Sequence, residues 1–217
     1  MRLLPRALLA LISLLPLACS AADKPAKFEA GTHYQLLPTP QQTADPSKIE
    51  VMEVFAYSCP HCFHLEGVVQ KWLAKKPADV NFVRLPHTLG APAALARDKA
   101  FYAADMLGVA EPFHRALFGA IHGQQKLMAS MEDVRELFVQ STGVKKEDFD
   151  GAYSSFAVDS RFRIGENQIL EMRISSVPTL VVDGRYLVKN GGQVFEIVDF
   201  LVDQVRQQRK AQPAKKK

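Results

Sequence analysis

Two cysteines separated by two residues, in the segment Cys59-Pro60-His61-Cys62, are the residues of this chain best suited to chemistry. At this spacing the two thiols can form a short disulfide that opens and closes reversibly. His61 can donate to the Cys59 sulfur or place positive charge near it. Either effect favours the Cys59 thiolate, which stabilises the reduced pair and makes its disulfide oxidising. The motif therefore predicts thiol–disulfide exchange.

The segments on either side of the motif predict a strand followed by a helix. Residues 49–57 form a mostly apolar run of strand length, rich in β-branched and aromatic residues. After the motif, apolar residues recur at helical spacing: Cys62, Leu65, Val69 and Trp72, with Val68 and Leu73 on the same face. Pro60 falls in the first turn, where its missing N–H is tolerated. Cys59 is thus expected to cap a helix, whose free N–H groups and partial positive charge stabilise a thiolate, and Cys62 to face the core.

Two structural roles for the cysteine pair are poorly supported. A disulfide across so short a loop stabilises a fold little through loop entropy. A zinc site would need further ligands, and only His61 and His64 lie nearby in the sequence. We therefore expect no metal, and no cofactor other than the redox-active Cys59–Cys62 disulfide itself.

The N-terminus is typical of a secretory signal peptide over residues 1–22. A short basic region precedes a mostly apolar run, residues 7–17, which is too short to span a bilayer as a helix. Small residues follow, and cleavage is expected after Ala22. A short membrane anchor is one alternative. Cys19 offers another, a lipid-modified N-terminus, although Pro16 stands where the lipid-attachment motif of bacterial lipoproteins usually has leucine.

The charge of the chain argues against nucleic-acid binding. The 217 residues carry a formal net charge of +4, of which Arg2 and Arg6 belong to the expected signal peptide. Six basic residues and no acidic ones lie between Arg206 and Lys217. Removing both groups leaves residues 23–205 formally negative, so the basic character belongs to the C-terminal tail. We predict a tail over residues 209–217 and a monomeric protein.

The rest of the chain predicts an α/β domain interrupted by helices. Residues 80–85 read as a second strand, parallel to the first across the helix. About eighty residues of helical pattern follow, and then strands return at 179–182 and 185–188 around an Asp183-Gly184 turn. The last helix carries apolar residues on one stripe from Val194 to Val205. The expected parts are the α/β domain (residues 23–88 and 166–208) and a helical insertion (residues 89–165).

Taken together, these segments resemble the DsbA-type periplasmic thiol:disulfide oxidoreductases. The resemblance is carried by Glu-Val-Phe-Ala-Tyr-Ser-Cys-Pro-His-Cys at 53–62, by the helical insertion, and by Ser-Val-Pro-Thr-Leu-Val-Val-Asp-Gly at 176–184. It implies a thioredoxin fold with an inserted all-helical domain. It also implies a cis Val177–Pro178 peptide beside the cysteine pair, where the backbone of Val177 would pair with an extended substrate.

The resemblance further implies a mechanism and partners. The Cys59–Cys62 disulfide would be donated to unfolded exported proteins that contain cysteines, and a quinone-linked inner-membrane partner of the DsbB type would restore it. Glu53 would lie beneath the active site and carry the Cys62 proton, although a strand-edge glutamate facing solvent is an equal alternative. Glu66 is expected to be an exposed helix residue. No role is assigned to the three histidines in or near the insertion: His87, His114 and His122.

Two other functions remain compatible with the sequence. The first is a disulfide isomerase or reductant. Isomerases of the DsbC type usually carry an N-terminal dimerisation domain, for which residues 23–48 are too short. The second is an exported binding or chaperone module in which the cysteine pair is incidental.

Overall fold

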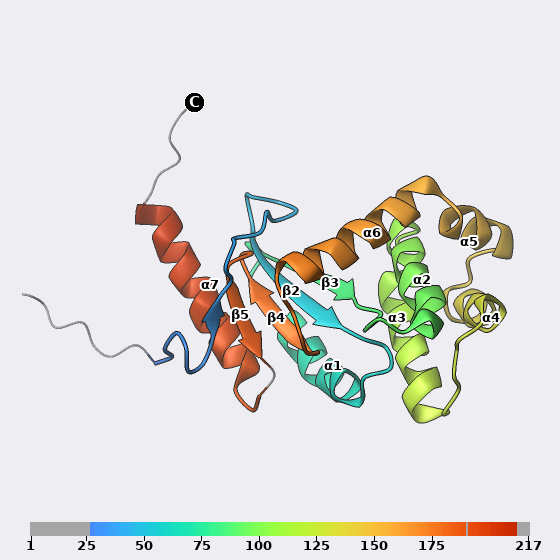
Figure 1. Ribbon diagram of the computed structural model, residues 1–217, viewed down its shortest axis with the longest axis horizontal. Helices are drawn as coiled ribbons and strands as arrows, with labels where there is room; N and C mark the ends of the chain where they lie inside the picture. The colour runs from blue at the N-terminus through green and yellow to red at the C-terminus, as the bar shows by residue number, and fades with distance from the viewer. Residues whose placement is uncertain (1–26, 190, 212–217) are drawn as a thin grey trace, which may run out of the picture.

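A five-stranded sheet in the order β1-β5-β4-β2-β3 forms the centre of the computed structural model, which describes residues 27–189 and 191–211 (Figure 1). β2 and β3 run parallel, as predicted, and the other neighbouring pairs are antiparallel. The strands are β1 (Gln35–Leu36), β2 (Ile49–Phe55), β3 (Val80–Pro86), β4 (Thr179–Val182) and β5 (Tyr186–Lys189).

β2 is buried along its whole length because helices cover both faces of the sheet. α1 (Pro60–Leu73) connects β2 to β3 and lies on the same face as the last helix, α7 (Val194–Ala211). α6 (Phe156–Glu171) covers the other face and leads back to β4 (Figure 1). The core under α1 and α7 includes Ile49, Val51, Leu65, Val69, Trp72, Val198 and Leu201. This arrangement explains why residues 49–55 are apolar without strict alternation.

The segment between β3 and β4 is helical, as predicted. It contains a short 3₁₀ turn (η1, Pro92–Ala94) and a π-helical turn (η2, Gly119–Gly123) beside the longer helices α2 (Leu95–Met106), α3 (Ala110–Phe118), α4 (Met131–Thr142) and α5 (Lys146–Tyr153). These helices stand beside the sheet as a separate bundle (Figure 1). Their shared core is aromatic: Phe101, Phe113, Phe118, Phe138 and Phe149. The insertion therefore has its own interior, continuous with the core beneath α6.

The expected boundary after residue 165 falls inside α6, which runs unbroken from Phe156 to Glu171. Gly165 lies where α6 crosses α2, and a Cβ there would be 2.2 Å from the Tyr102 hydroxyl. The missing side chain allows the close approach of the two helices. α6 therefore packs closely on α2 of the bundle, while Ile169 near its end joins the core that includes Met52 and Val54 of β2.

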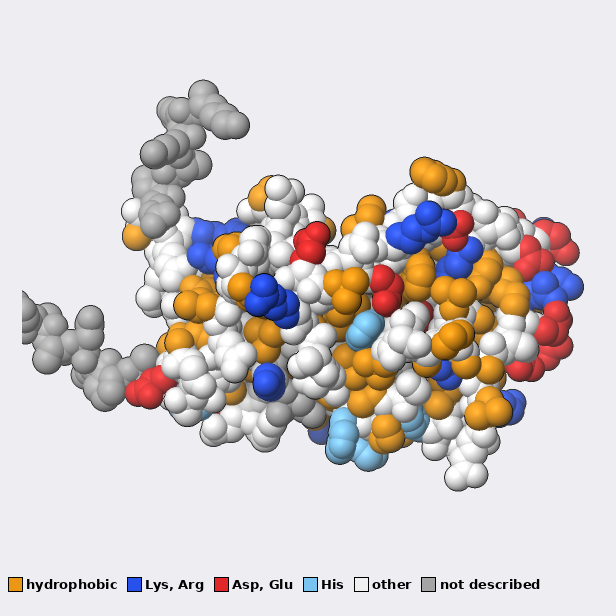
Figure 2. Space-filling model, in the orientation of Figure 1, with side chains coloured by type: hydrophobic (Ala, Val, Ile, Leu, Met, Phe, Trp, Pro, Cys, Tyr) orange, Lys and Arg blue, Asp and Glu red, His pale blue; other side chains and the backbone are white. Residues whose placement is uncertain are grey.

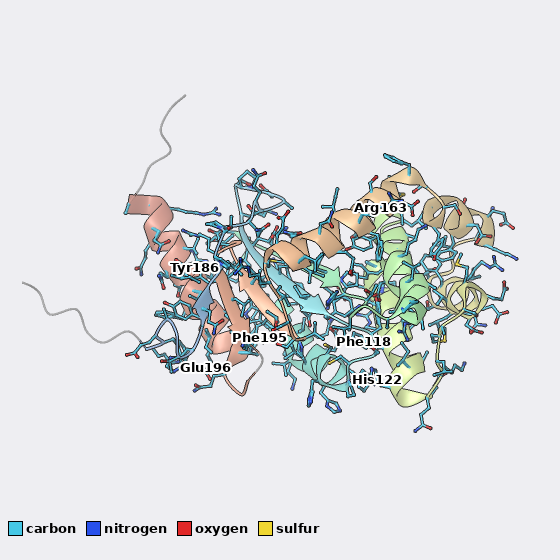
Figure 3. All side chains as sticks on the ribbon, viewed as in Figure 1. Phe118, His122, Arg163, Tyr186, Phe195 and Glu196 are labelled. Atoms are coloured by element: carbon cyan, nitrogen blue, oxygen red, sulfur yellow. The ribbon has the colours of Figure 1, made fainter. Side chains whose placement is uncertain are left out.

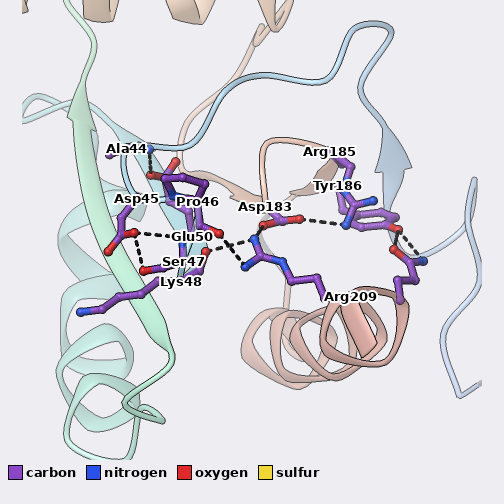
Figure 4. Close-up of polar contacts among 11 residues, drawn as sticks. Ala44, Asp45, Pro46, Ser47, Lys48, Glu50, Asp183, Arg185, Tyr186 and Arg209 are labelled. Carbon is purple, nitrogen blue, oxygen red and sulfur yellow. Dashed lines mark hydrogen bonds and ion pairs between the residues drawn. The ribbon is translucent and has the colours of Figure 1, made fainter. Parts of the chain in front are cut away.

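Asp183 and Gly184 form the predicted turn between β4 and β5, and both have left-handed φ angles, +53° and +62°. Gly184 is required here, because a Cβ would lie 2.2 Å from the carbonyl oxygen of Gln41. Arg209 of α7 reaches the same turn and contacts Asp183 at 2.6 Å (Figure 4). It also donates to the carbonyl oxygen of Pro46 at 3.1 Å.

The predicted start of the basic tail at residue 209 is therefore wrong. Residues 209–211 continue α7, and the Arg209 guanidinium fastens that helix to the sheet. Residues 212–217 lie outside the described residues, as does the expected signal peptide with Cys19. Over residues 27–189 and 191–211, no helix has the length and apolar character needed to cross a bilayer.

Candidate active site

Cys59 caps α1, as the sequence predicts. Its backbone is extended (φ −87°, ψ 114°), and its sulfur accepts a hydrogen bond from the Cys62 N–H at 3.4 Å. Both thiols are free in this structure; Cys59 is partly exposed, while Cys62 is completely buried. Pro60 and His61 are exposed between them. Cys59 is therefore the sulfur that another molecule can reach, with a helix N-terminus behind it to stabilise a thiolate.

Val177 and Pro178 lie beside the cysteine pair, although more than a hundred residues separate the two segments. The Val177–Pro178 peptide bond is cis, as expected from the resemblance. The Cys59 sulfur is 3.7 Å from the carbonyl oxygen of Val177 and can donate to it. A chain bound along the Val177 backbone would consequently pass next to the reachable sulfur.

Glu53 points from the middle of β2 into the core on the α1 face. Its side chain is fully buried, and its oxygens make no hydrogen bond to any described residue. Burial, reinforced by the charge of Glu66, raises the pKa of Glu53 to about 8, against the opposing effect of Arg84. The alternative of a solvent-facing strand-edge glutamate is wrong.

Cys62 holds its proton strongly. Burial raises the pKa of the Cys62 thiol well above its usual range, and the charges of Cys59 and Glu53 act in the same direction. A hydrogen bond with the backbone of Ala56 opposes these effects only in part. A Cys62 thiolate released into this site would therefore take up a proton readily, and Glu53 is close enough to act on the pKa of this thiol.

Arg84, on β3, is the centre of a buried ionic cluster. Its guanidinium lies 3.5 Å from Glu53 and 3.3 Å from Glu66, and it also pairs with Glu111 of α3. Only 5% of the Arg84 side chain is exposed. Three carboxyl groups thus share one cation, so they cannot all ionise at equal cost. The expectation that Glu66 is an exposed helix residue is wrong: it faces inward and belongs to this cluster.

His114 and His122, which received no role from the sequence, both hold the segment before Cys59. The Tyr57 hydroxyl lies 3.0 Å from His114 Nδ1, and the Tyr57 carbonyl oxygen lies 2.8 Å from His122 Nε2. His122 also stacks on Phe63 of α1, with the ring centroids 4.9 Å apart. Figure 3 places the labelled His122 and Phe118 beside α1, and Figure 2 shows histidine side chains gathered over this region.

His87 lies elsewhere, at the junction between β3 and the insertion. Its ring is 3.3 Å from Glu166 of α6, and that carboxylate also accepts from the backbone N–H of Thr88 at 3.2 Å. This cluster holds the loop where the insertion begins. Nowhere in the described part of the chain do three or more His, Cys, Asp or Glu side chains gather in a way that could hold a metal ion.

The fold and the site together define a class of protein. A cysteine pair at the start of the helix after a central strand, facing a cis-proline loop, is the arrangement of a thioredoxin-fold thiol:disulfide oxidoreductase. The family model for the DSBA-like thioredoxin domain matches residues 50–205. The chain belongs to this family of DsbA-like proteins, and it is a thiol:disulfide oxidoreductase with an inserted helical domain.

Individual relatives support the same assignment. The chain is 35% identical over 205 residues to the thiol:disulfide interchange protein DsbA of Pseudomonas aeruginosa, covering 92% of this chain and 94% of that protein. It is 36% identical over 211 residues to DsbA of Azotobacter vinelandii, covering 94% and 98%. The crystal structure of Pseudomonas aeruginosa DsbA superposes with a TM-score of 0.78 at 34% identity, covering 84% of this chain and 97% of that one.

Proposed function

We propose that this protein is a periplasmic disulfide oxidase, which donates its Cys59–Cys62 disulfide to newly exported proteins. The observation that carries the proposal is the asymmetry of the pair: Cys59 is reachable beside the Val177 backbone, whereas Cys62 is buried in the core, where Glu53 acts on its pKa. In such a pair the substrate reacts with the Cys59 sulfur, and Cys62 is the leaving group.

Capture of the substrate uses the backbone next to Pro178. An unfolded chain lies extended along Val177 and forms main-chain hydrogen bonds, which do not depend on the substrate's sequence. This contact brings a substrate thiolate to the Cys59 sulfur, which is 3.7 Å from the Val177 carbonyl oxygen in the reduced pair. Recognition through backbone groups suits an enzyme that oxidises many different proteins.

The first exchange joins the substrate to Cys59. The substrate thiolate attacks the Cys59 sulfur, the Cys59–Cys62 bond breaks, and Cys62 leaves with the electron pair. Glu53, protonated at neutral pH because its pKa is about 8, gives its proton to the departing Cys62 sulfur. The products are a mixed disulfide, a Cys62 thiol and a Glu53 carboxylate.

The second exchange releases the oxidised substrate. A second substrate thiolate attacks the substrate sulfur of the mixed disulfide, and Cys59 leaves as a thiolate that the helix N-terminus and the Cys62 N–H stabilise. The substrate has lost two electrons and the pair has gained them. In reoxidation the Glu53 carboxylate takes back the Cys62 proton, and a quinone-linked membrane partner of the DsbB type accepts the electrons.

Equilibration with glutathione tests the direction of the reaction. We expect a reduction potential more oxidising than that of thioredoxin, because the reduced pair is stabilised. A potential in the thioredoxin range would refute the oxidase and favour a reductant. In cells, the pair should be oxidised when a DsbB-type partner is present and should accumulate as thiols when it is deleted; an unchanged redox state would rule out that partner.

His61 provides a prediction at the exposed part of the motif. His61→Pro removes a group that can donate to the Cys59 sulfur or place charge near it, so we expect a less oxidising disulfide. The potential against glutathione measures this directly. If the variant has the same reduction potential as wild type, and its Cys59 is alkylated with the same pH dependence, the role given to His61 is contradicted.

Export is the remaining part of the proposal. Removal of residues 1–22 by signal peptidase would give a monomer that begins at Asp23 and is free in the periplasm. N-terminal sequencing of the processed protein and its sedimentation test this. A mature N-terminus at a lipid-modified Cys19 would show a membrane-anchored form instead.

A further inference from the structure

His114 is a buried histidine that the exchange reaction described above does not use. It lies on α3 of the helical insertion, its side chain is fully buried, and its ring packs against Phe55 and Phe118 at centroid distances of 5.0 and 4.9 Å. A histidine in such a place can find polar partners for its ring nitrogens only inside the protein. Both of its nitrogens face residues that adjoin the cysteine pair.

The two partners of His114 fix its tautomer. Nε2 is 3.1 Å from the Glu66 carboxylate, an acceptor, so Nε2 carries the proton. Neither of these two atoms meets the full geometry of a hydrogen bond, so the contact is a close polar one between the ring N–H and the carboxylate. Nδ1 is then the acceptor for the Tyr57 hydroxyl at 3.0 Å. Burial lowers the pKa of His114, which agrees with a neutral ring.

This histidine links the two sides of the cysteine motif. Tyr57 lies two residues before Cys59, and Glu66 lies one helical turn after Cys62. Glu66 is in turn 3.3 Å from Arg84, which also reaches Glu53. A continuous chain of polar contacts therefore runs from the helical insertion to the carboxyl group beneath Cys62.

We propose that His114 is a positioning residue of disulfide exchange: it holds Glu66 ionised beside Arg84, so that the proton of the buried cluster resides on Glu53, where Cys62 can use it. This inference rests on the proton transfer from Glu53 proposed above. The helical insertion thereby takes part in the chemistry of the thioredoxin-like domain, through one side chain that touches neither sulfur.

The charge balance within the cluster gives the physical reason. Burial tends to raise the pKa of Glu66, but His114 and Arg84 together overcome this effect, and the net pKa of Glu66 is lowered. Without His114 the burial penalty is opposed mainly by Arg84, which two other carboxylates share. Glu66 then competes for the proton with Glu53, the carboxyl whose charge acts on the pKa of Cys62.

Titration of the two carboxyl groups tests the proposal directly. The side-chain carboxyl carbons of the reduced protein are followed by NMR after labelling with carbon-13 glutamate, and they are assigned with Glu53→Gln and Glu66→Gln. In His114→Phe, which keeps a ring among the aromatic neighbours, the titration midpoint of Glu66 should rise by about one pH unit or more. Glu53 should lose part of its titration to Glu66.

Other ionisable groups face this cluster and need to be separated from His114. They are Glu53 on β2, Tyr57 after it, Glu66 on α1, Arg84 on β3, Asp98 on α2 and Glu111 on α3. Glu111→Gln removes the most exposed carboxylate of the set. The rise in the Glu66 midpoint caused by His114→Phe should persist in that background, because it comes from the lost histidine.

Reaction rates give the functional half of the test. At neutral pH, mixed-disulfide formation with a dithiol peptide should be about two- to ten-fold slower in His114→Phe. The lower value corresponds to a proton shared equally between Glu53 and Glu66, and the higher value to a proton that favours Glu66 about ten to one. His114→Gln should bring both the Glu66 midpoint and the exchange rate back toward their wild-type values, because its amide can donate to Glu66. Phe138→Leu, a core change elsewhere in the insertion, should loosen the fold without moving the Glu66 midpoint.

Each result decides the proposal. An unmoved Glu66 midpoint in His114→Phe overturns it, as does an equal shift in Phe138→Leu, or a moved midpoint with an unchanged exchange rate. If His114→Phe does not fold, Tyr57→Phe and His114→Gln take its place, and they should shift the midpoint less but in the same direction. Failure of the oxidase function would appear separately, as a wild-type protein that does not oxidise the peptide.

Discussion

Glu53→Gln is predicted to change how the stability of the reduced protein depends on pH. The substitution keeps the size of the side chain and removes its proton equilibrium. In the folded protein the pKa of Glu53 is about 8, and its ordinary value is 4.5. Between these values the folded protein holds a proton that the unfolded chain has lost, so rising pH favours unfolding.

The size of the effect follows from the difference between the two pKa values, 8 and 4.5. Each pKa unit corresponds to about 1.4 kcal/mol, so wild type should lose about 5 kcal/mol relative to Glu53→Gln as the pH rises through this interval. Asp98 is a second buried carboxyl whose pKa burial raises to about 8. It acts in the same direction in both proteins and therefore cancels in the comparison.

Urea unfolding of both reduced proteins across this pH interval measures the difference in their free energies of unfolding. Reducing conditions keep the disulfide from varying along with pH. We expect the free energy of unfolding of wild type, relative to that of the variant, to be highest at the acidic end of the interval and to fall steadily toward pH 8. A difference that stays constant, or that increases with pH, would falsify the assignment of Glu53 as the protonated carboxyl of this site.

Three further predictions concern accessibility and packing. Each cysteine can be tested alone with iodoacetamide at neutral pH, followed by mass spectrometry. Cys59 in the Cys62→Ala variant should be alkylated at least about ten-fold faster than Cys62 in the Cys59→Ala variant, and equal rates would contradict the buried position of Cys62. Gly165→Ala should lower the free energy of unfolding by about 1–3 kcal/mol, because its Cβ would clash with the Tyr102 hydroxyl, and wild-type stability would refute that contact. Arg209→Ala should cost about 1 kcal/mol in urea unfolding; no loss would mean that the end of α7 is not fastened.

The cysteine pair could be placed from sequence because its signals are local. A strand-like run, a proline in the first turn and a helical stripe all occur within about twenty-five residues, and together they put Cys59 at a helix cap. The same holds for the Asp183-Gly184 hairpin, whose turn chemistry lies in two adjacent residues. Where the determinants of a feature are adjacent in the chain, the prediction and the structure agree.

The orientation of Glu53 could have been decided from the predicted topology. A parallel pair of strands joined by a helix is usually covered on both faces, and Glu53 lies at an alternate position with Ile49 and Val51, which pack beneath α1. The residue type alone is compatible with either a core or a solvent-facing position. A charged side chain in the middle of a strand covered on both faces was the available signal.

Glu66, Arg84 and His114 could not be assembled from the sequence. They come from α1, β3 and α3, and only the packing of the insertion against the thioredoxin-like domain brings them together. The helical spacing of His114 with Leu117 and Phe118 could have suggested burial, since all three lie on the inner side of α3. Nothing in that spacing names Tyr57 or Glu66 as its partners, because partner identity depends on tertiary contacts.

The two residues between the cysteines have a freedom that the rest of the site lacks. Pro60 and His61 are exposed, whereas Cys62 and Glu53 are fully enclosed by the core. Substitutions of Pro60 or His61 can therefore alter the reduction potential of the cysteine pair without disturbing side-chain packing. Any substitution of Cys62 or Glu53, by contrast, also changes the core. Adaptation to a new cellular redox balance, in evolution or in the laboratory, would accordingly begin at Pro60 and His61 and leave Cys62 and Glu53 in place.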